Sequence, residues 1–278
     1  MITFMNIGKY GRLGNQIFQY AAMVSIARHL GERYVLPSSS IEPTMGAYFN
    51  DTTKEYEFGH FEMFECFNIK CPLIDDHKLK LGIGANYSEP SFCYHDSFWD
   101  LSNNTNIHGY FQSEEYFINI RDELLKQLTF KDEIVQKAKD FISQIDAKTT
   151  AFIHVRRGDN VAHPDVHPLS CLDYISKTTS ELKTQYPGIK FVVLTDDLTW
   201  SRKNIVGEEF VFSDNNHFVD LAIMTLCDQT IIANSSFSWW GAWLNDNEKQ
   251  IVYAPKTWFG PRGPPKWDSV YCKDWRVI

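Results

Sequence analysis

The sequence predicts an α/β protein whose sheets are mainly parallel. Short apolar runs alternate with stretches of helical periodicity through the second half of the chain, and this alternation is typical of parallel strands joined by helices. The N-terminal segment shows the same order once: an apolar run, a glycine-containing loop, a helical stretch and a second apolar run. A length of 278 residues allows one large domain or two of ordinary size.

The first half is predicted to open with a strand–loop–helix–strand unit and then to become less regular. Turn clusters and aromatic-rich short runs between residues 38 and 110 indicate inserted loops that could hold a variable ligand. The predicted elements are a strand at 2–7, a helix at 15–30, a strand at 33–37, a strand end at 108–113 and helices at 114–127 and 131–145.

The second half is predicted to form a regular parallel sheet, and the turn at 146–149 is the predicted domain boundary. In such sheets ligands bind at the carboxyl ends of the strands, so the chemistry is expected in the loops that follow them. The predicted strands are 151–155, 190–194, 209–212, 229–233 and 250–254, and the predicted helices are 170–184, 198–204, 216–227 and 238–245.

Composition places the chain among globular proteins. Hydrophobic residues make up 44% and charged residues 22%, which excludes a disordered, collagen-like or coiled-coil chain. The net charge of −8 disfavours nucleic-acid binding over a broad basic surface but permits a local anion site. The six cysteines include no C-x-x-C pair, and neither a signal peptide nor an apolar stretch of about 18 residues is evident. We therefore expect a cytoplasmic protein that contacts membranes only peripherally.

The strongest chemical signal is HVRRGD at residues 154–159, directly after a predicted strand. The guanidinium groups of Arg156 and Arg157 suit bidentate contacts with phosphate oxygens, and Gly158 allows a close backbone approach. The alternative is structural: one arginine pairs with Asp159 and the other is solvated. The position at a strand end favours a phosphate site.

A serine-rich helix start follows the predicted strand 229–233. Free amides at a helix N-terminus attract phosphate, and serine is a preferred N-cap. The alternative is simple capping, with the neighbouring tryptophans in the core. The candidate residues are Asn234, Ser235, Ser236, Phe237 and Ser238.

Two weaker signals complete the set. Thr195, Asp196 and Asp197 follow another strand and could bind a metal, ribose or base, with helix capping favoured as a single role. The chain has no D-x-D triplet and no clustered metal-ligand spacing, so we expect no metal and leave arginine to neutralise the anion. The loop 11–16 only loosely resembles a dinucleotide loop, because G-x-G-x-x-G is absent.

These four segments together resemble the α-1,2-fucosyltransferases of glycosyltransferase family 11. The matching residues are GRLGNQIFQYA (11–21), HVRRGD (154–159), LTDD (194–197) and SSFSWWGAWL (235–244). The resemblance implies a GT-B-like fold of two Rossmann-like lobes that face each other across a cleft. It also implies transfer of L-fucose from GDP-β-L-fucose to the 2-hydroxyl of a terminal β-galactoside with inversion, without a metal or other cofactor. The acceptor would be a galactose-terminated oligosaccharide or glycolipid.

On this reading, residues 1–148 form the acceptor-side lobe and residues 149–278 the GDP-fucose lobe. Arg156 is expected to bind the pyrophosphate and to stabilise the leaving GDP. The residues expected to contact the donor are Arg157, Gly158, Thr195, Asp196, Asp197, Asn234, Ser235, Ser236, Phe237, Ser238, Gly14, Asn15 and Gln16.

The general base has three candidate answers. Asp159 lies close to Arg156 in sequence and follows a strand, but an Arg157–Asp159 pair that only orders the loop would fit the same spacing. His154 is the rival, although strand alternation puts it on the same face as Arg156, which suggests donor contact. A loose transition state could also proceed with little help from any base.

Two other classes of protein remain as alternatives. A dinucleotide-dependent oxidoreductase would share the alternating pattern but lacks the glycine fingerprint. A non-catalytic glycan-binding protein would explain the 15% aromatic content but gives no reason for arginines and serines to converge. Unlike vertebrate family members, the chain shows no N-terminal membrane anchor, which suggests a bacterial, cytoplasmic version. Residues 38–110 match no family motif, so they leave the galactoside unidentified.

Overall fold

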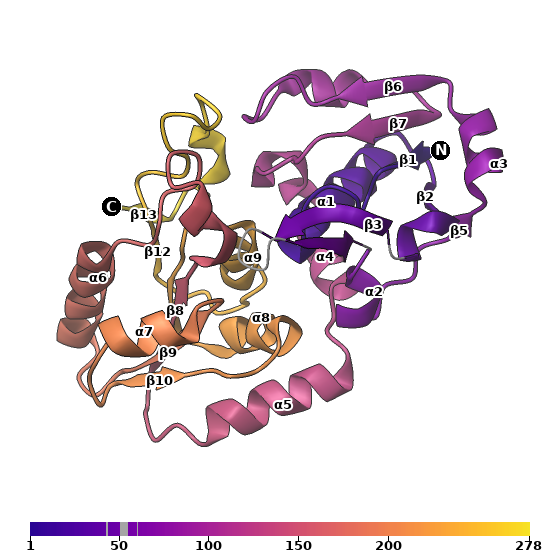
Figure 1. The fold of residues 1–278 in the computed structure, drawn as a ribbon. Coiled ribbons are helices and arrows are strands. Elements are labelled where there is room, and N and C mark those ends of the chain that lie inside the picture. The colour runs from indigo at the N-terminus through magenta and orange to yellow at the C-terminus, as the bar shows by residue number, and fades with distance from the viewer. Residues whose placement is uncertain (43, 51–54, 60) are drawn as a thin grey trace. The chain divides into compact units, whose positions relative to one another are not determined.

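The computed structural model describes residues 1–42, 44–50, 55–59 and 61–278, and it divides into two compact units (Figure 1). Unit 1 comprises Met1–Thr129 and Lys266–Cys272, and unit 2 comprises Phe130–Pro265 and Lys273–Ile278. Each unit is built around its own parallel sheet. The predicted α/β class with parallel sheets is confirmed.

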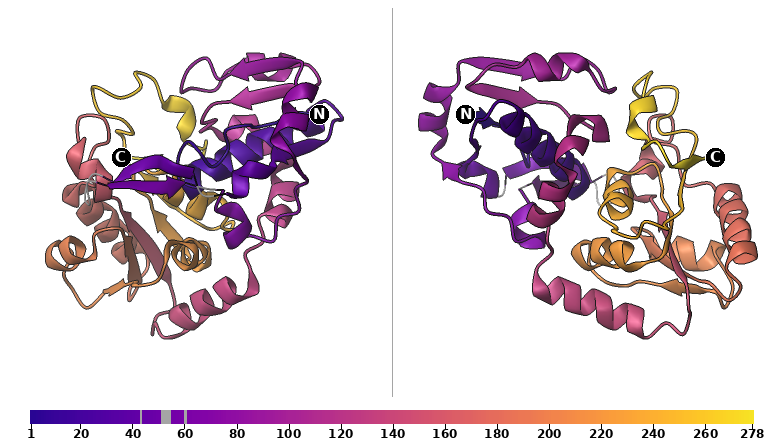
Figure 2. Two further views of the ribbon diagram at one scale, coloured as in Figure 1. Left: turned by 45° about the vertical axis from the view of Figure 1, so that its right-hand side comes forward. Right: turned by 180° about the vertical axis from the view of Figure 1, so that it is seen from behind.

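The division between the units lies earlier in the chain than the predicted boundary at 148/149. Helix α5 (Asp132–Ser143) packs against helix α8 (His217–Leu226) of unit 2, as the ribbon views also show (Figure 2). A single amphipathic helix gives no sign in its sequence of the sheet that it covers, so α5 was expected in the first lobe. A C-terminal segment returns to unit 1, where the Ser269 hydroxyl accepts a 2.8 Å hydrogen bond from the Tyr94 amide.

Unit 1 contains a five-stranded sheet in the order β5-β2-β1-β7-β6, and every neighbouring pair is parallel. The first strand is shorter than predicted, and three strands of this sheet fall in the region expected to be irregular. The strands are β1 (Ile2–Thr3), β2 (Tyr34–Pro37), β5 (Leu73–Ile74), β6 (Ala85–Ser88) and β7 (Thr105–His108). An antiparallel pair, β3 (Thr44–Asn50) and β4 (Glu55–Gly59), stands apart from it.

Helix α1 (Leu13–His29) is the core of unit 1. It is buried on all sides, since nearly all of its residues from Leu13 to Ala27 are buried, which is typical of a helix enclosed by its own domain. The polar side chains inside it find partners, such as the Tyr20 hydroxyl, which donates a 2.7 Å bond to Gln127 Oε1. The other helices of this unit are η1 (Ser38–Ile41), α2 (Met63–Cys66), α3 (Asp76–Gly82), η2 (Asp96–Asp100), η3 (Glu114–Tyr116), η4 (Ile118–Ile120), α4 (Arg121–Gln127) and η6 (Asp268–Val270).

Unit 2 contains a six-stranded parallel sheet in the order β10-β9-β8-β11-β12-β13. The five predicted strands are all present, and a short C-terminal strand extends the edge. Continuous apolar runs form the central strands because both faces of this sheet are covered. The strands are β8 (Thr150–Val155), β9 (Lys190–Thr195), β10 (Phe210–Phe212), β11 (Gln229–Ile231), β12 (Val252–Ala254) and β13 (Arg276–Val277).

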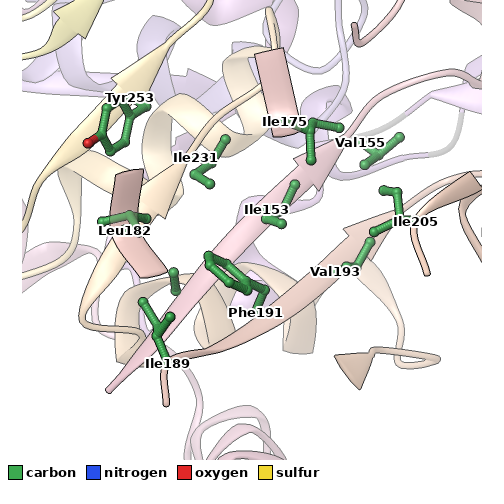
Figure 3. Close-up of a cluster of buried hydrophobic side chains, with 11 residues drawn as sticks. Ile153, Val155, Ile175, Leu182, Ile189, Phe191, Val193, Ile205, Ile231 and Tyr253 are labelled. Atoms are coloured by element: carbon green, nitrogen blue, oxygen red, sulfur yellow. The ribbon is translucent and has the colours of Figure 1, made fainter. Parts of the chain in front are cut away.

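The two faces of this sheet bury alternate residues of β8 and β9. Ile153 and Val193 point into the cluster that Ile175 and Leu182 of α6 cover (Figure 3). His154 lies on the opposite face, against Phe237 of α9. The remaining helices of unit 2 are η5 (Gly158–Ala162), α6 (Leu172–Gln185), α7 (Leu198–Asn204) and α9 (Ser236–Trp243). Within the described ranges, none of the helices combines the length and apolar character that crossing a bilayer requires.

Candidate functional site

The candidate site lies at the carboxyl edge of the unit 2 sheet. Strand β8 pairs with β9 on one side and with β11 on the other, all three in parallel. The segments that follow them, 156–159, 195–197 and 234–238, are therefore neighbours in space (Figure 1). The sequence prediction that these three motifs share one edge is confirmed, and this edge is where ligands bind in parallel α/β sheets.

Arg156 is held by two carboxylates. Its guanidinium pairs with both Asp159 and Asp196, and its backbone N–H donates a 3.1 Å bond to the Ser170 hydroxyl. The side chain is 18% exposed. Gly158 makes this arrangement possible, because a Cβ there would stand 2.8 Å from Arg156 Nη1 and 2.5 Å from Asp196 Oδ2. The guanidinium is thus fixed in orientation at the sheet edge.

Arg157 is held by different partners. Its Nε donates a 3.1 Å bond to Asp197 Oδ2, its backbone N–H donates a 2.8 Å bond to Asp196, and its guanidinium carbon lies 4.0 Å from the centre of the Trp200 ring. The Arg157–Asp159 pair considered from the sequence is wrong, since Asp159 pairs with Arg156. Asp159 lies in the first turn of the short helix η5, three residues after Arg156, and its carboxylate turns back toward that arginine.

The carboxylates after β9 link two loops of the sheet. Asp197 is the N-cap of α7 and accepts a 3.0 Å bond from the Trp200 amide, as its sequence position predicted. The Thr195 hydroxyl accepts a 3.0 Å bond from the Asp197 amide. Asp196 and Asp197 therefore act first as partners of the two arginines and of their own helix. A direct donor contact by the Thr195 hydroxyl remains a prediction.

The predicted serines at the start of α9 differ in burial and in hydrogen bonding. Ser235 caps the helix by accepting a 3.3 Å bond from the Phe237 amide, and Ser236 is half-buried in the first turn. Ser238 is fully buried, and its hydroxyl accepts a 3.3 Å bond from the Ala233 amide. A direct donor contact by Ser238 does not fit this burial, because the hydroxyl completes the turn from β11 into the helix.

Asn234 also has a structural role at this edge. Its side-chain amide donates to the carbonyls of Pro168, at 3.0 Å, and Trp258, at 3.2 Å. These bonds join three loops that follow different strands. Asn234 therefore positions the serine-rich turn, and any contact between it and the donor remains a prediction.

His154 is buried beneath the site. Burial, with the positive charge of Arg156 adding to it, lowers the pKa of His154 to about 3, so the imidazole is neutral. Its ring centre lies 5.6 Å from that of Phe237. A buried neutral imidazole under a phenylalanine supports the sheet edge, and this placement disfavours the role as general base that the sequence left open.

The sequence reading missed three side chains of this edge. Ser170 binds the Arg156 amide, Trp200 lies under Arg157, and His167 is close enough to Asp159 and Arg156 for their charges to affect it. Burial lowers the pKa of His167, while Asp159 raises it and Arg156 lowers it. Trp200 stands three residues after the capping Asp197, which was a usable signal. The other two lie in a loop without a recognisable pattern.

The glycine loop at residues 11–16 belongs to unit 1 and is hydrogen-bonded to other residues of that unit. Gln16 is fully buried, and its side chain bonds the Gly11 carbonyl at 3.3 Å and the Glu62 amide at 2.8 Å. The Glu62 carboxylate accepts a 3.0 Å bond from the Leu13 amide at the start of α1. Gly14 is buried, and Asn15 accepts a 2.7 Å bond from Gln112.

This arrangement gives the loop a structural role, and a donor contact by Gly14, Asn15 or Gln16 remains a prediction. A carboxylate of the protein already occupies the positive end of the α1 dipole, which disfavours phosphate there. The predicted site residues thus fall into two groups in different units. Those of unit 2 form a compact charged cluster, whereas Gly14, Asn15 and Gln16 stabilise the fold of unit 1.

The charged edge offers two oriented guanidinium groups to an anion. Two arginines meet three carboxylates, so the guanidinium groups are oriented before any ligand arrives, and a phosphate would compete with or add to these pairs. Across the described parts of the chain, no three His, Cys, Asp or Glu side chains gather in a way that could hold a metal ion. All six cysteines are free thiols.

Comparisons with known proteins identify the family of the chain. The family model "Glycosyl transferase family 11" matches residues 2–278. The O-antigen biosynthesis glycosyltransferase WbnK of Escherichia coli is 27% identical over 92% of this chain and 95% of its own. An Escherichia coli alpha-1,2-colitosyltransferase is 34% identical over 54% of this chain and 55% of its own. The galactoside 2-alpha-L-fucosyltransferase Sec1 of Mus musculus is 26% identical over 86% of this chain and 63% of its own.

Similarity to solved structures supports the fold. The crystal structure of the NodZ alpha-1,6-fucosyltransferase soaked with GDP-fucose aligns with a TM-score of 0.53 at 14% identity, over 87% of this chain and 92% of that one. The arrangement of two parallel sheets with covering helices is thus the GT-B-like fold.

Proposed function

The chain belongs to glycosyltransferase family 11, and on that premise we propose that it transfers L-fucose from GDP-β-L-fucose to the 2-hydroxyl of a terminal β-galactoside. The transfer inverts the anomeric centre and forms an α-1,2 linkage. The mouse relative named as a galactoside 2-alpha-L-fucosyltransferase supports both the donor sugar and the acceptor. The observation that carries the proposal is the pair of oriented arginines at the carboxyl edge of the unit 2 sheet.

The arginines fit the demands of the departing nucleotide. Negative charge builds on the β-phosphate oxygen as the bond to the sugar breaks, and a guanidinium that is already oriented gains strength as that charge develops. Asp159 and Asp196 hold Arg156 from two sides. We assign Arg156 to the pyrophosphate and Asp159 to the positioning of Arg156. Arg157 and Ser236 are the remaining donor contacts that the arrangement favours.

The reaction is proposed to need neither a metal ion nor another cofactor. The support is chemical: two guanidinium groups supply the positive charge that a divalent cation would otherwise supply at the diphosphate. The enzyme is proposed to act in the cytoplasm on galactose-terminated oligosaccharides or glycolipids, with peripheral contact to membrane-linked intermediates. The free thiols of all six cysteines support a reducing compartment.

A second candidate differs only in the donor sugar. The Escherichia coli relative named as an alpha-1,2-colitosyltransferase is 34% identical over the 161 aligned residues. Its name gives the same α-1,2 linkage with colitose as the sugar, so the alternative is an activated colitose donor in place of GDP-fucose. The charged edge of unit 2 would bind the nucleotide of either donor in the same way.

The test is a transfer assay with each GDP-sugar and a panel of β-galactosides, run in EDTA. We expect an α-1,2-fucosylated product by mass spectrometry and NMR, with full activity in the chelator. Activity with GDP-colitose alone would replace the proposal with the second candidate. Loss of activity in EDTA that Mg²⁺ restores would contradict the metal-free part. Binding of glycans without turnover of any GDP-sugar would contradict the proposal as a whole.

A further inference from the structure

A pocket of about 270 Å³ lies at the carboxyl edge of the unit 1 sheet. Its walls come from three segments that follow neighbouring strands of the order β1-β7-β6 (Figure 1). The loop after β1 supplies Tyr10, and the segments after β6 and β7 supply the rest. The lining residues are Tyr10, Glu89, Ser91, Phe92, His108, Gly109 and Tyr110.

Glu89 fixes the turn that follows β7. Its Oε2 accepts a 2.8 Å bond from the Tyr110 amide and a 3.0 Å bond from the Phe111 amide. Phe111 has a φ of 52°, a left-handed conformation that costs a bulky residue about 1–3 kcal/mol. A Cβ at Gly109 would stand 2.5 Å from Glu89 Cβ, so the turn requires glycine there. The strain and the close packing indicate a turn that is held in shape rather than a loose loop.

Gln19 joins this turn to the glycine loop. Its side-chain Nε2 donates to the Tyr10 carbonyl at 3.1 Å and to the Gly109 carbonyl at 3.3 Å. Gln19 is fully buried in α1, so both walls of the pocket are attached to the core helix of the unit. The motif GRLGNQIFQYA therefore stabilises this pocket through Gln19. This role of the motif is separate from binding of the donor.

Four rings surround the opening. Tyr10 is 48% exposed and Tyr110 is 40% exposed, although both are large aromatic residues. The ring centres of Tyr10 and His108 are 5.3 Å apart, and those of Phe92 and Tyr110 are 6.4 Å apart. Exposed aromatic rings beside a pocket offer flat apolar faces with polar edges, which suit the faces and hydroxyls of a pyranose.

The charge of the pocket disfavours binding of the nucleotide-sugar donor. No Lys or Arg is among its lining residues, and its one carboxyl group is that of Glu89. A diphosphate would meet no cation there, whereas a neutral ligand needs none. The volume of about 270 Å³ lies just below the range of about 300–1,000 Å³ for drug-sized ligands, so one sugar residue is the fitting size.

We propose that this aromatic pocket of unit 1 binds a pyranose residue of the acceptor glycan. The ring of Tyr110 and the ring of Tyr10 stack on the sugar, the carboxyl group of Glu89 holds the turn that carries Tyr110, and Gln19 positions both walls. The identification of the sugar as part of the acceptor rests on the proposed fucosyl transfer. The binding of a neutral sugar by the pocket does not, because it follows from the pocket alone.

The direct test is saturation-transfer NMR on the full chain with methyl β-D-galactopyranoside as the probe. We expect transfer from the wild type, a loss of roughly tenfold in affinity in Tyr10→Ala and Tyr110→Ala, and near-normal binding in the ring-retaining Tyr10→Phe and Tyr110→Phe. Leu81→Ala, which removes an exposed apolar side chain of α3, is the matched control and should bind normally. Circular dichroism confirms that each variant is folded.

Kinetics separate the pocket from the donor site. In the transfer assay, Tyr110→Ala should raise the KM for the galactoside roughly tenfold while the KM for the GDP-sugar stays unchanged. Equal binding of the probe by Tyr110→Ala and the wild type would overturn the proposal that this pocket binds a sugar. A wild type that binds the probe at this pocket but turns over no GDP-sugar would overturn the proposed transfer and leave the sugar pocket standing.

Discussion

The carboxyl edges of the two sheets differ in charge although both follow a strand–loop–helix pattern. In unit 2 two arginines and three aspartates meet beside a helix that begins at serines. In unit 1 the edge carries aromatic rings and one glutamate, and the start of α1 is already bound to the Glu62 carboxylate. The pattern alone therefore does not make an anion site. What matters is whether the protein's own carboxylate already occupies the helix start.

The buried polar groups at the two edges also have different roles. In unit 2 the carboxylates orient cations that a ligand can reach, with Arg156 18% and Arg157 14% exposed. In unit 1 the buried Gln16 and Gln19 bond backbone carbonyls and amides, and so they stabilise loops. We infer that charged chemistry is confined to unit 2 and that recognition of neutral sugar is confined to unit 1. The predictions below test that division.

The largest effect is expected at Arg156. Arg156→Ala removes the guanidinium on which the leaving phosphate depends, and a lost contact of this kind lowers the rate by roughly 10²–10³-fold. Arg156→Lys should fail almost as badly, because the fork that pairs with two carboxylates is lost. Arg262→Ala, at an exposed arginine of the same unit paired with Asp165, is the control. Near-normal kcat in Arg156→Ala would contradict the assignment.

A smaller effect is expected at Asp159. Because Asp196 also holds Arg156, Asp159→Asn should lower kcat by less than about tenfold, below the 10²–10⁴-fold that a general base contributes. The pH–rate profile should keep the shape seen in the wild type. Asp165→Asn in the same loop serves as the control. A fall of a hundredfold or more, with loss of the limb that reports a base, would show that Asp159 takes the proton.

The serines of α9 should separate by function. Ser236→Ala should raise the KM for the GDP-sugar a few-fold and leave the melting temperature unchanged, since this half-buried hydroxyl has room to meet the donor. Ser238→Ala should leave both KM values unchanged and lower the free energy of unfolding by about 1–3 kcal/mol, because the Ala233 amide loses its buried partner. The reverse pattern would show that Ser238 is the donor contact.

The smallest effect is a pH dependence of stability from Glu89 in unit 1. Burial raises the pKa of Glu89 from 4.5 to about 6, while the amides of Phe111 and Tyr110 and the Tyr116 hydroxyl oppose the rise. The folded protein thus binds this proton more tightly than the unfolded chain. The corresponding stability is full below pH 4.5 and is lost as the pH rises through about 6, a change of about 2 kcal/mol.

Glu89→Gln removes this dependence and keeps an oxygen for the two backbone amides. The variant should gain stability over the wild type as the pH rises from 5 to 7, measured by urea unfolding at each pH. Tyr87 and Tyr116 face the carboxyl group, and neither titrates in this range, since burial raises the pKa of each above 10. A difference that is constant with pH would contradict the raised pKa.

The strands and the charged edge of unit 2 could be predicted because their signals are local. Continuous apolar runs mark β8 and β9, and the residues directly after them carry the charges, so the parallel arrangement brings Arg156 and Asp196 together without further information. The N-cap roles of Asp197 and Ser235 likewise depend on residues within one turn.

The features that the sequence did not predict depend on contacts between residues that are distant in sequence. Glu62 reaches the start of α1 across 49 positions, and Gln19 reaches Gly109 across 90. No local sequence pattern indicates such partners, so the structural role of the glycine loop could not be predicted. The pocket beside Glu89 was missed for the same reason, since its walls come from three separate strand ends. The buried position of Ser238 could not be predicted, because a serine that caps and a serine that binds occupy the same positions in a helix start.

The most direct test of the division is hydrogen exchange by mass spectrometry with GDP alone. We expect slower exchange at the unit 2 edge, in residues 156–159, 195–197 and 234–238, and unchanged exchange at 10–16 and 109–112 of unit 1. Protection of residues 11–16 without any change at 156–159 would contradict it, because the nucleotide would then bind the glycine loop rather than the arginines.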